Sequence, residues 1–554
     1  MKCTLPPNIR QDASLAPLPL PLPLPPPPPP PPTPPPPPPL SKDQPILLPP
    51  VRLDTTLAEL YMTNGIPGPF IATLHCVFGH MDLHPSFPRE LVYPEDEEPV
   101  PLCSSSSPEN TTTPTPTPSS PSDELAKLRK TILGLKPLRR AFGLGNMDVL
   151  FFAPNITNHN IQLHQRLLYQ QLAPSQRHRP RIICLDRGPD AQAHVQAQLQ
   201  RATRGRKLVF WRPQGWMDDQ SHDCLLAPRD MYDLNSKMYL LTSGMRTPPC
   251  QVVDIQTVSL EDAIDTCASS PPAIHTTATT TTATKNNNTL HTHPLPFVLK
   301  LCRAGCGFGT FIIRTEAQRR AALRAMRTYQ ARGVREVLVS AYIDLVQDLS
   351  VHFVVGAPGT QHDRRNPLIV GVTVQTLATT PGSKPKDGDE EAAGATTGQA
   401  TWVGGRIDYT QQETLRKLVW DTVQDTASKM PETFVGWAGV DIVVERGAAQ
   451  RQWVVDLNAR ITGSMPICLL RGHFWDERGL AMAQFAAVEY RGASKADGAD
   501  EVYSRLRALV ETGQVVVTAT AQVDEGLYMA DVIWGGKDAD ELEEVQECIR
   551  TRLG

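Results

Sequence analysis

The sequence predicts an α/β protein, with α+β parts, in which a doubly wound parallel unit precedes a second domain of mixed helices and strands, behind a disordered Pro-rich arm. Short apolar segments alternate with helical stretches over residues 148–211, which is the pattern of parallel β-α-β units. Two runs of β-branched residues flank a polar turn within residues 440–457, as in an antiparallel hairpin. Proline dominates the first fifty residues and removes the backbone donors that regular structure needs.

The composition excludes several classes of function. Lys and Arg number 54 against 58 Asp and Glu, a net charge of -4, so a broad basic field for nucleic acid is absent from the sequence. No run of eighteen apolar residues suits a membrane span, and prolines fill the place of a signal helix. The 11 cysteines include no CxxC pair. We expect a cytoplasmic protein that binds neither nucleic acid nor membrane, and its length allows an enzyme of ordinary size.

The N-terminal region is expected to be mostly disordered through residue 122. Residues 15–50 alternate Leu with Pro and then become nearly continuous Pro, which favours polyproline II. This arm is expected to be a spacer, although SH3 or WW domains are possible partners. Residues 51–94 regain apolar content without a clear period and are assigned no element. A Ser, Thr and Pro tract at 103–122 completes the arm.

The folded elements follow in order. Residues 123–228 are expected to form the parallel unit, with strands at 148–153, 181–185 and 207–211 and helices up to 172 and at 190–201. A second domain spans 229–490 and has insertions at about 268–295 and 379–400. Its expected helices are 230–244, 315–332 and 411–430, and its expected strands are 297–301, 336–341 and 349–356. Residues 491–554 are expected to form an α/β extension.

The hairpin within 440–457 carries the sharpest chemical pattern. A symmetric register pairs Val444 with Trp453 and, further out, Asp441 with Asp456. Because side chains alternate along a strand, Asp456 shares a face with two further polar residues, Asn458 and Arg460. Directly opposed carboxylates repel, and oxygen ligands suit Mg²⁺. The alternative is a pair of strands whose acids are solvated or paired with Arg460.

Two further segments suggest a nucleotide site. Lys300 lies in an apolar strand, where its ammonium group is costly unless it meets an anion. A loop with three glycines follows: Gly305, Gly307 and Gly309. Because these residues have no side chains, backbone N–H groups of the loop could approach phosphate oxygens. Neither the P-loop nor the dinucleotide pattern is met, and a surface lysine before a flexible turn remains the alternative. Asp348, between two expected strands, is available to a ribose hydroxyl, or belongs to an ordinary connection.

Together, in order and separation, these segments resemble the ATP-grasp superfamily of nucleotide-dependent ligases over residues 147–464. Fungal ATP-grasp proteins described as specific to solid-state culture are similar. The strongest match is the run Asp-Leu-Asn-Ala-Arg-Ile-Thr-Gly-Ser that begins at Asp456. The resemblance implies a pre-ATP-grasp unit followed by a two-lobed ATP-grasp domain.

The resemblance also implies the roles of individual residues. Asp441 and Asp456 would hold the metal, Asn458 a second ion, and Arg460 would face the transferred phosphoryl group. The resemblance implies ATP as the nucleotide, bound together with two metal ions that are Mg²⁺ or Mn²⁺. The implied nucleotide contacts are Lys237, Lys300, the glycine loop at 304–310 as a lid, Ser340, Tyr342 and Asp348. The family usually has Glu where Asp456 stands.

The implied activity is that of an ADP-forming ligase that joins carbon to nitrogen. A small carboxylate would be activated as an acylphosphate, which an amine then attacks. The family also commonly has acidic residues in the hinge between its lobes, where this chain has Ser340 and Ala341. Two alternatives stay open on the same scaffold: a small-molecule kinase, and an ATP-binding module with degenerate catalysis, which the short Asp456 and this altered hinge would suit. A scaffold that acts mainly through its Pro-rich arm is a third.

Overall fold

The computed structural model describes residues 48–75, 135, 138–153, 171–184, 191–211, 223–256, 295–303, 309–331, 334–379, 400–447, 450–492, 498–524 and 526–553. The expected helix before residue 172, nearly all of both insertions, Gly305, Gly307 and most of the arm lie outside these residues. Within them, three β-sheets form the framework, and no helix is long and apolar enough to cross a membrane. The predicted α/β class is confirmed.

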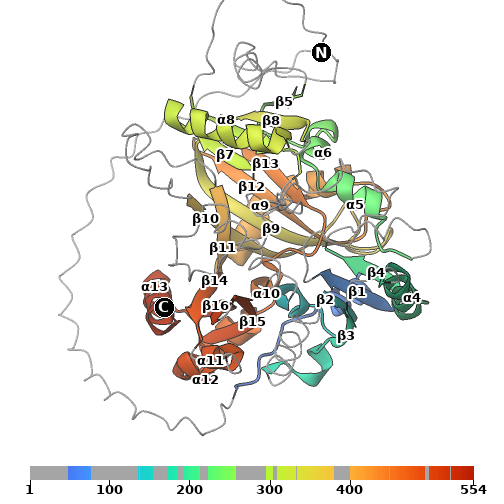
Figure 1. Ribbon diagram of the computed structural model, residues 1–554, viewed down its shortest axis with the longest axis vertical. Coiled ribbons are helices and arrows are strands. Elements are labelled where there is room, and N and C mark those ends of the chain that lie inside the picture. The colour runs from blue at the N-terminus through green and yellow to red at the C-terminus, as the bar shows by residue number, and fades with distance from the viewer. Residues whose placement is uncertain are drawn as a thin grey trace, which may run out of the picture. The chain divides into compact units, whose positions relative to one another are not determined.

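The first sheet is parallel and has four strands in the order β3-β2-β1-β4. The strands are β1 (Phe70–His75), β2 (Asp148–Ala153), β3 (Arg179–Cys184) and β4 (Lys207–Phe210). The helix α4 (Ala191–Thr203) joins β3 to β4, and a 3₁₀ turn at Pro174–Gln176 precedes β3. Figure 1 shows this sheet and α4 together.

The expectation of disorder through residue 122 is wrong for residues 51–75. The helix α1 (Leu57–Thr63) begins with a capping box in which Thr56 and Glu59 bond each other's backbone N–H groups. Strand β1 follows and lies between β2 and β4, so β2 and β4 do not pair. The strand is buried on both faces and therefore lacks the alternation that would reveal it, and α1 is only two turns long.

Truncation tests this correction. Removing residues 1–75 deletes β1, whose Ile71 pairs with both Asp148 and Leu208. We expect that truncated chain to be insoluble or molten because its parallel sheet loses a central strand. A chain that begins at residue 48 keeps every element described and should retain the cooperative thermal unfolding of the full chain. Equal melting curves for the two truncations would contradict the placement of β1.

The second sheet is small and antiparallel, with the order β5-β8-β6-β7. Its strands are β5 (Cys250–Asp254), β6 (Phe297–Leu301), β7 (Thr310–Ile313) and β8 (Glu336–Ala341). The helix α8 (Glu316–Ala331) packs Ala322 and Met326 onto Phe297 and Phe311 of this sheet. Strands β5 and β7 were not predicted from the sequence.

The predicted helix at 230–244 is two helices, α5 (Pro228–Leu234) and α6 (Lys237–Thr242). The break lies at Asn235 and Ser236. The Ser236 hydroxyl accepts a hydrogen bond from the backbone N–H of Met238 and so caps the second helix. The break matters for function because Lys237 becomes the first residue of α6.

The third sheet has eight strands in the order β13-β12-β9-β10-β11-β14-β16-β15, all antiparallel. They are β9 (Leu345–Val355), β10 (Leu368–Thr379), β11 (Ala400–Asp408), β12 (Gly436–Glu445), β13 (Gln452–Asn458), β14 (Met482–Arg491), β15 (Val515–Asp524) and β16 (Leu527–Gly536). The remaining helices are α9 (Gln412–Lys429), α10 (Met465–Cys468), a π-helical turn at Gly472–Asp476, α11 (Gly498–Arg505), α12 (Arg507–Glu511) and α13 (Ala539–Leu553).

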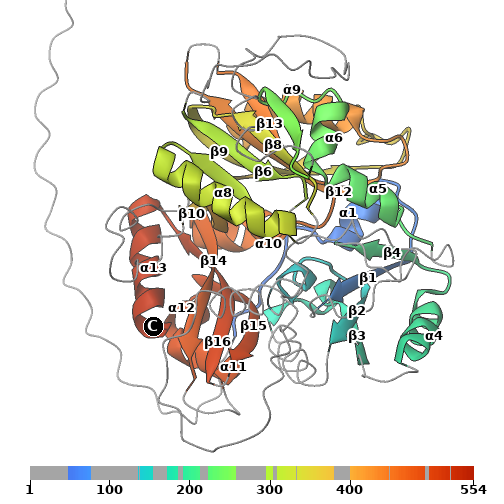
Figure 2. The same cartoon turned by 45° about the horizontal axis from the view of Figure 1, so that its top comes forward.

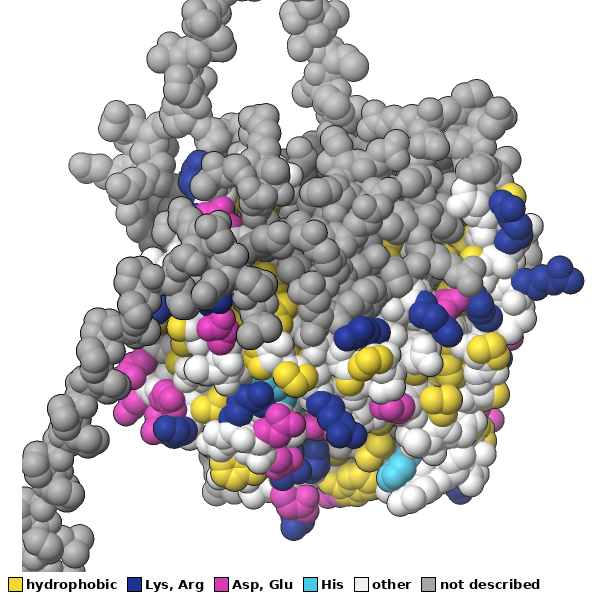
Figure 3. Space-filling view, turned by 90° about the horizontal axis from the view of Figure 1, so that it is seen from below, with side chains coloured by type: hydrophobic (Ala, Val, Ile, Leu, Met, Phe, Trp, Pro, Cys, Tyr) yellow, Lys and Arg dark blue, Asp and Glu magenta, His cyan; other side chains and the backbone are white. Residues whose placement is uncertain are grey.

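The C-terminal residues extend this third sheet. Strands β15 and β16 join it through β14, which pairs with β16 along its whole length. Figure 2 shows α13 beside β14 and β16. Strands β10, β11 and β14 were not predicted, and β9 begins four residues earlier than expected. On the face shown in Figure 3, basic and acidic side chains of the described residues are interspersed, in keeping with the small net charge.

Candidate active site

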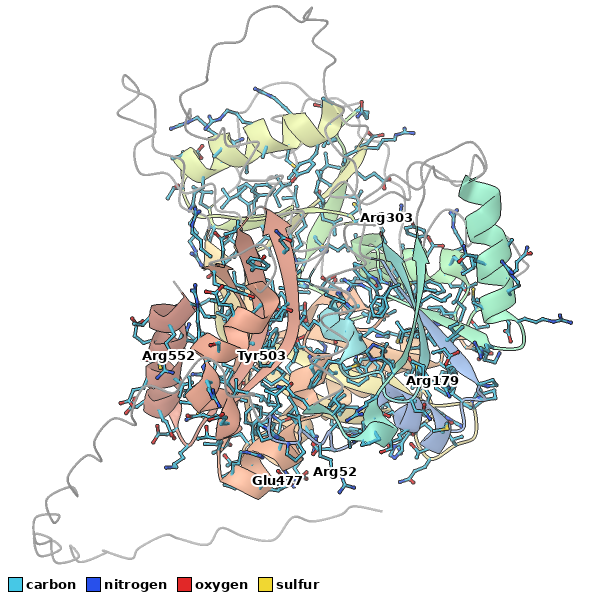
Figure 4. All side chains as sticks on the ribbon, turned by 60° about the horizontal axis from the view of Figure 1, so that its bottom comes forward. Arg52, Arg179, Arg303, Glu477, Tyr503 and Arg552 are labelled. Carbon is cyan, nitrogen blue, oxygen red and sulfur yellow. The ribbon has the colours of Figure 1, made fainter. Side chains whose placement is uncertain are left out.

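One cavity of about 240 Å³ lies where α6, the small sheet and the hairpin of the large sheet meet. Most residues predicted from distant parts of the sequence line it together: Lys237, Lys300, Ser340, Tyr342, Asp348, Asp441, Asp456, Asn458 and Arg460. Gly309 of the glycine loop has a φ of 69° and does not line the cavity, whereas Thr310, the last residue of the loop, does. Arg303, labelled in Figure 4, follows β6 and pairs with Asp233 of α5 at 3.7 Å.

The hairpin β12–β13 has a β-bulge that the symmetric register missed. Asp441 pairs with Asp456 as predicted, whereas Val444 pairs with Gln452 and Trp453 pairs with Val443. The predicted pairing of Val444 with Trp453 is therefore wrong by one residue. A bulge leaves Val455 as the extra residue on β13 and restores the register at the two aspartates.

The bulge provides a contact for Lys300. Its Nζ donates to the backbone carbonyl of Val455 at 3.2 Å, so the ammonium group of β6 reaches across to the large sheet. Burial, followed by the nearby charge of Lys237, lowers the pKa of Lys300, and Asp456 opposes this. Lys237 Nζ lies 3.4 Å from Asp456 Oδ1. Two lysines thus meet the acidic hairpin inside the cavity.

The carboxylates are destabilised in their charged forms. Burial, followed by the charge of Asp456, raises the pKa of Asp441 to about 7, although Ser350 donates a hydrogen bond to it at 2.8 Å. Burial raises the pKa of Asp348 to about 6, against the effect of Lys300. Among the described residues, Asp348 Oδ1 is a buried oxygen without a hydrogen-bond partner. A positive ion or a donating ligand would relieve both groups.

The donor set fits a hard divalent cation. No group of three or more His, Cys, Asp or Glu side chains in the described residues is arranged to hold a metal. Asp441 and Asp456 face each other, and the amide oxygen of Asn458 accepts from Arg460 at 2.6 Å. Two carboxylates and an amide suit Mg²⁺, which keeps water ligands and shares phosphate oxygens.

The raised pKa values predict a pH dependence of stability without metal. Because the folded chain holds a proton on Asp441 up to about pH 7, whereas an unfolded Asp releases it near 3.8, this contribution to stability is lost as pH rises between these values. We expect Asp441→Asn to raise the melting temperature increasingly over wild type from pH 4 to 7, in chelator. A difference that does not change with pH would contradict the raised pKa of Asp441 in the folded chain.

Several cavity residues were not predicted from the sequence. Among them are Arg139 and Arg140 before β2, Gln375 and Leu377 of β10, and Trp402 of β11. Thr462, Gly463 and Ser464 also line the cavity; they belong to the run that begins at Asp456, but the sequence assigned them no role. The only signal for Arg139 and Arg140 is the dibasic pair itself, since their segment carries no motif. Thr462 is fixed by buried neighbours: Trp437 Nε1 donates to its hydroxyl at 3.2 Å, and the hydroxyl lies 3.0 Å from His352 Nδ1.

The predicted hinge residues have structural partners of their own. Ser340 is buried in β8 between β5 and β6. The Tyr342 hydroxyl accepts a hydrogen bond from Arg314 at 3.0 Å, and the Arg314 guanidinium lies 5.2 Å from the centre of the Tyr342 ring. The end of β8 therefore offers backbone groups and one aromatic ring to the cavity.

Neither a protein-family model nor a curated protein sequence matches this chain. Among solved structures, it is similar to an ADP complex of N5-carboxyaminoimidazole ribonucleotide synthetase, with a TM-score of 0.44 and 11% identity over 75% of this chain and 95% of that one. A carboxyaminoimidazole ribonucleotide synthase from Aspergillus clavatus, complexed with ATP, has a TM-score of 0.43 and 9% identity over 74% of this chain and 93% of that one. An L-amino acid ligase from Bacillus licheniformis has a TM-score of 0.40 and 11% identity over 76% of this chain and 93% of that one. Each of these three similarities spans about three quarters of this chain.

Proposed function

We propose that this protein is an ATP- and Mg²⁺-dependent, ADP-forming ligase that activates a small carboxylate as an acylphosphate for attack by an amine. The observation that carries the proposal is the cavity between α6, the small sheet and the hairpin. It joins two lysines, an opposed pair of aspartates, an asparagine and an arginine from separate segments of the chain. Phosphoryl transfer needs such positioning and charge neutralisation more than it needs a protein nucleophile.

The nucleotide would lie along the small sheet. Lys300 and Lys237 would contact its phosphates, since both ammonium groups lie at the hairpin that would hold the metal. Asp348, whose buried Oδ1 has no hydrogen-bond partner among the described residues, would accept a hydrogen bond from a ribose hydroxyl. The end of β8, from Ser340 to Tyr342, would contact the base with backbone groups and a ring.

The metal would be held by Asp441, Asp456 and Asn458. When bound, Mg²⁺ neutralises phosphate charge and orients the terminal phosphate. The protein's contribution is the bulged hairpin, which keeps the two carboxylates directly opposed. Burial and, after it, the charge of Asp456 raise the pKa of Asp441, and a cation bound between the two carboxylates would offset both costs.

The proposed reaction has two steps. A carboxylate oxygen of the acid forms a bond to the terminal phosphorus of ATP while the bond from that phosphorus to ADP breaks. The amine nitrogen then forms a bond to the acyl carbon, loses a proton, and inorganic phosphate leaves with the electron pair of the broken C–O bond. Arg460, held beside Asn458 by a 2.6 Å hydrogen bond, would stabilise the negative charge in both steps.

Product analysis tests the proposal. The full chain, with Mg²⁺ and ATP, is assayed for ADP and inorganic phosphate against a grid of small carboxylates and amines. A ligase releases both products only when acid and amine are present together. ADP with a stable phosphorylated acid and no free phosphate would indicate a kinase. Tight ATP binding without ADP for any combination would indicate a binding module and contradict the ligase.

A further inference from the structure

The cavity has a second charged region beyond the proposed metal site. Arg139, Arg140 and Arg460 line it together with Trp402 and the segment from Thr462 to Ser464; we call this group the arginine end. The chain runs from Val455, which accepts the hydrogen bond of Lys300, to this segment after β13. The lysines, the aspartates and the arginine end therefore line one cavity, and the segment after β13 connects them along the chain.

Both new arginines are held against this segment. Arg140 Nε donates to the backbone carbonyl of Ile461 at 3.1 Å, and its guanidinium lies 4.1 Å from the centre of the Trp211 ring. Arg139 is close enough to Gly463 that a Cβ there would lie 3.4 Å from its terminal nitrogen. Arg139 is 6% exposed and Arg140 is 2% exposed. Their orientation is therefore set by packing before any ligand binds.

The support for Arg139 comes from distant strands. Its Nε pairs with Asp531 of β16 at 2.5 Å. Its guanidinium also lies 5.6 Å from the ring centres of Trp402 in β11 and Phe485 in β14. The C-terminal strands thus brace one wall of the cavity.

The charges in the cavity wall are unevenly distributed. Among the described residues that line it, the carboxylates are Asp348, Asp441 and Asp456, which lie with the two lysines. The described lining of the arginine end contributes three guanidinium groups and no carboxylate, while Asp531 of β16 pairs with Arg139 and offsets its charge. Buried positive charge favours an anionic ligand, and a guanidinium fits a carboxylate or phosphate through paired N–H groups.

We propose that the arginine end binds a second anionic group of the acid substrate, a carboxylate or phosphate other than the carboxyl group that is activated. The substrate class is then an acid with at least two anionic groups. This inference rests on the proposed ligase function, and it assigns Arg139 and Arg140 to substrate specificity. Arg460, next to Asn458, would lie between the two groups of the substrate.

Matched acids test the inference. Each pair shares an activatable carboxyl group and differs in the second anion: glutamate and glutamine, succinate and its monoamide, 3-phosphoglycerate and glycerate. Binding to the full chain is measured by calorimetry with Mg²⁺ and a non-hydrolysable ATP analogue, and ADP formation is measured with the amine grid. In at least one pair we expect the anionic member to bind about 10- to 100-fold more tightly. The last pair separates phosphate from carboxylate.

The variant Arg140→Gln should remove most of this preference. We expect its ratio of anionic to neutral affinity to fall about 10-fold or more, while its affinity for the ATP analogue stays unchanged and shows that the chain is folded. Arg140→Lys keeps the charge and should retain part of the preference. Arg204→Gln makes the same change at an exposed turn of the first unit and should have no effect.

The outcomes separate this inference from the ligase proposal. Equal binding within every pair, no binding by any acid, or an unchanged ratio in Arg140→Gln would each overturn the arginine end as an anion site. If ADP then forms with acid and amine, the ligase stands without it. If an anionic acid binds through Arg140 and no amine yields ADP, the ligase proposal fails and the anion site stands.

Discussion

Replacing Asp456 with Asn should reduce turnover by about three orders of magnitude and leave the fold intact. Asp456 faces Asp441 across the bulged hairpin and also meets Lys237, so it lies where metal, phosphate and lysine would converge. Asn keeps the size of the side chain and can still accept from the Leu457 N–H, which Asp456 Oδ1 accepts at 3.1 Å. The loss is therefore one of charge, and cation binding depends on charge.

The measurement is turnover over a series of Mg²⁺ concentrations at saturating ATP. Asn458→Ala should show a loss of the same kind, because it removes the amide oxygen beside Arg460. Asp425→Asn, on the outer part of α9 in a surface pair with Lys429, is the matched control. Wild-type turnover in Asp456→Asn would show that the metal assignment is wrong.

Replacing Lys300 with Met should weaken ATP binding by about 100-fold while stabilising the protein. The ammonium group lies in a strand with Leu299 and Leu301 buried on either side, and burial lowers its pKa. An apolar chain of similar length removes this cost and also removes the positive charge that would meet the phosphates. Opposite changes in melting temperature and ATP affinity are thus expected from one substitution.

Equilibrium binding of an ATP analogue and thermal unfolding measure the two effects. Lys207→Met is the control, since Lys207 lies at the start of β4 and pairs with Asp223 outside the cavity. An affinity for ATP within about threefold of wild type would remove Lys300 from the phosphate site. A lower melting temperature would show that its bond to the Val455 carbonyl contributes more than its desolvation costs.

Local sequence patterns were enough where one element carries the signal. The hairpin has a period of two over β-branched residues, so Asp441, Asp456 and Asn458 could be placed on it without a structure. The pairing near the turn of the hairpin could not be predicted from the sequence, because the bulge at Val455 depends on contacts outside the hairpin. One such contact is the backbone N–H of Val454, which donates to the carbonyl of Arg246.

Elements buried on both faces escaped prediction for a related reason. Strand β1 is apolar on both sides because other elements cover it, so its sequence has neither the helical nor the alternating period. The helix α6 was merged with α5 because both are short, and the cap at Ser236 carries the only local sign of a break. Because of that break, Lys237 is the first residue of α6, where it lines the cavity.

What the sequence by itself determined is the chemistry available: opposed acids, an Asn and an Arg on one strand face, and a lysine inside an apolar strand. What only the tertiary structure decided is which side chains share a space. Lys237, Lys300, Asp348 and the hairpin come together because two sheets and α6 meet, and Arg139 and Arg140 join them through contacts with Asp531 and Ile461. Local periodicity reports one element's exposure, whereas a site is made by the packing of several.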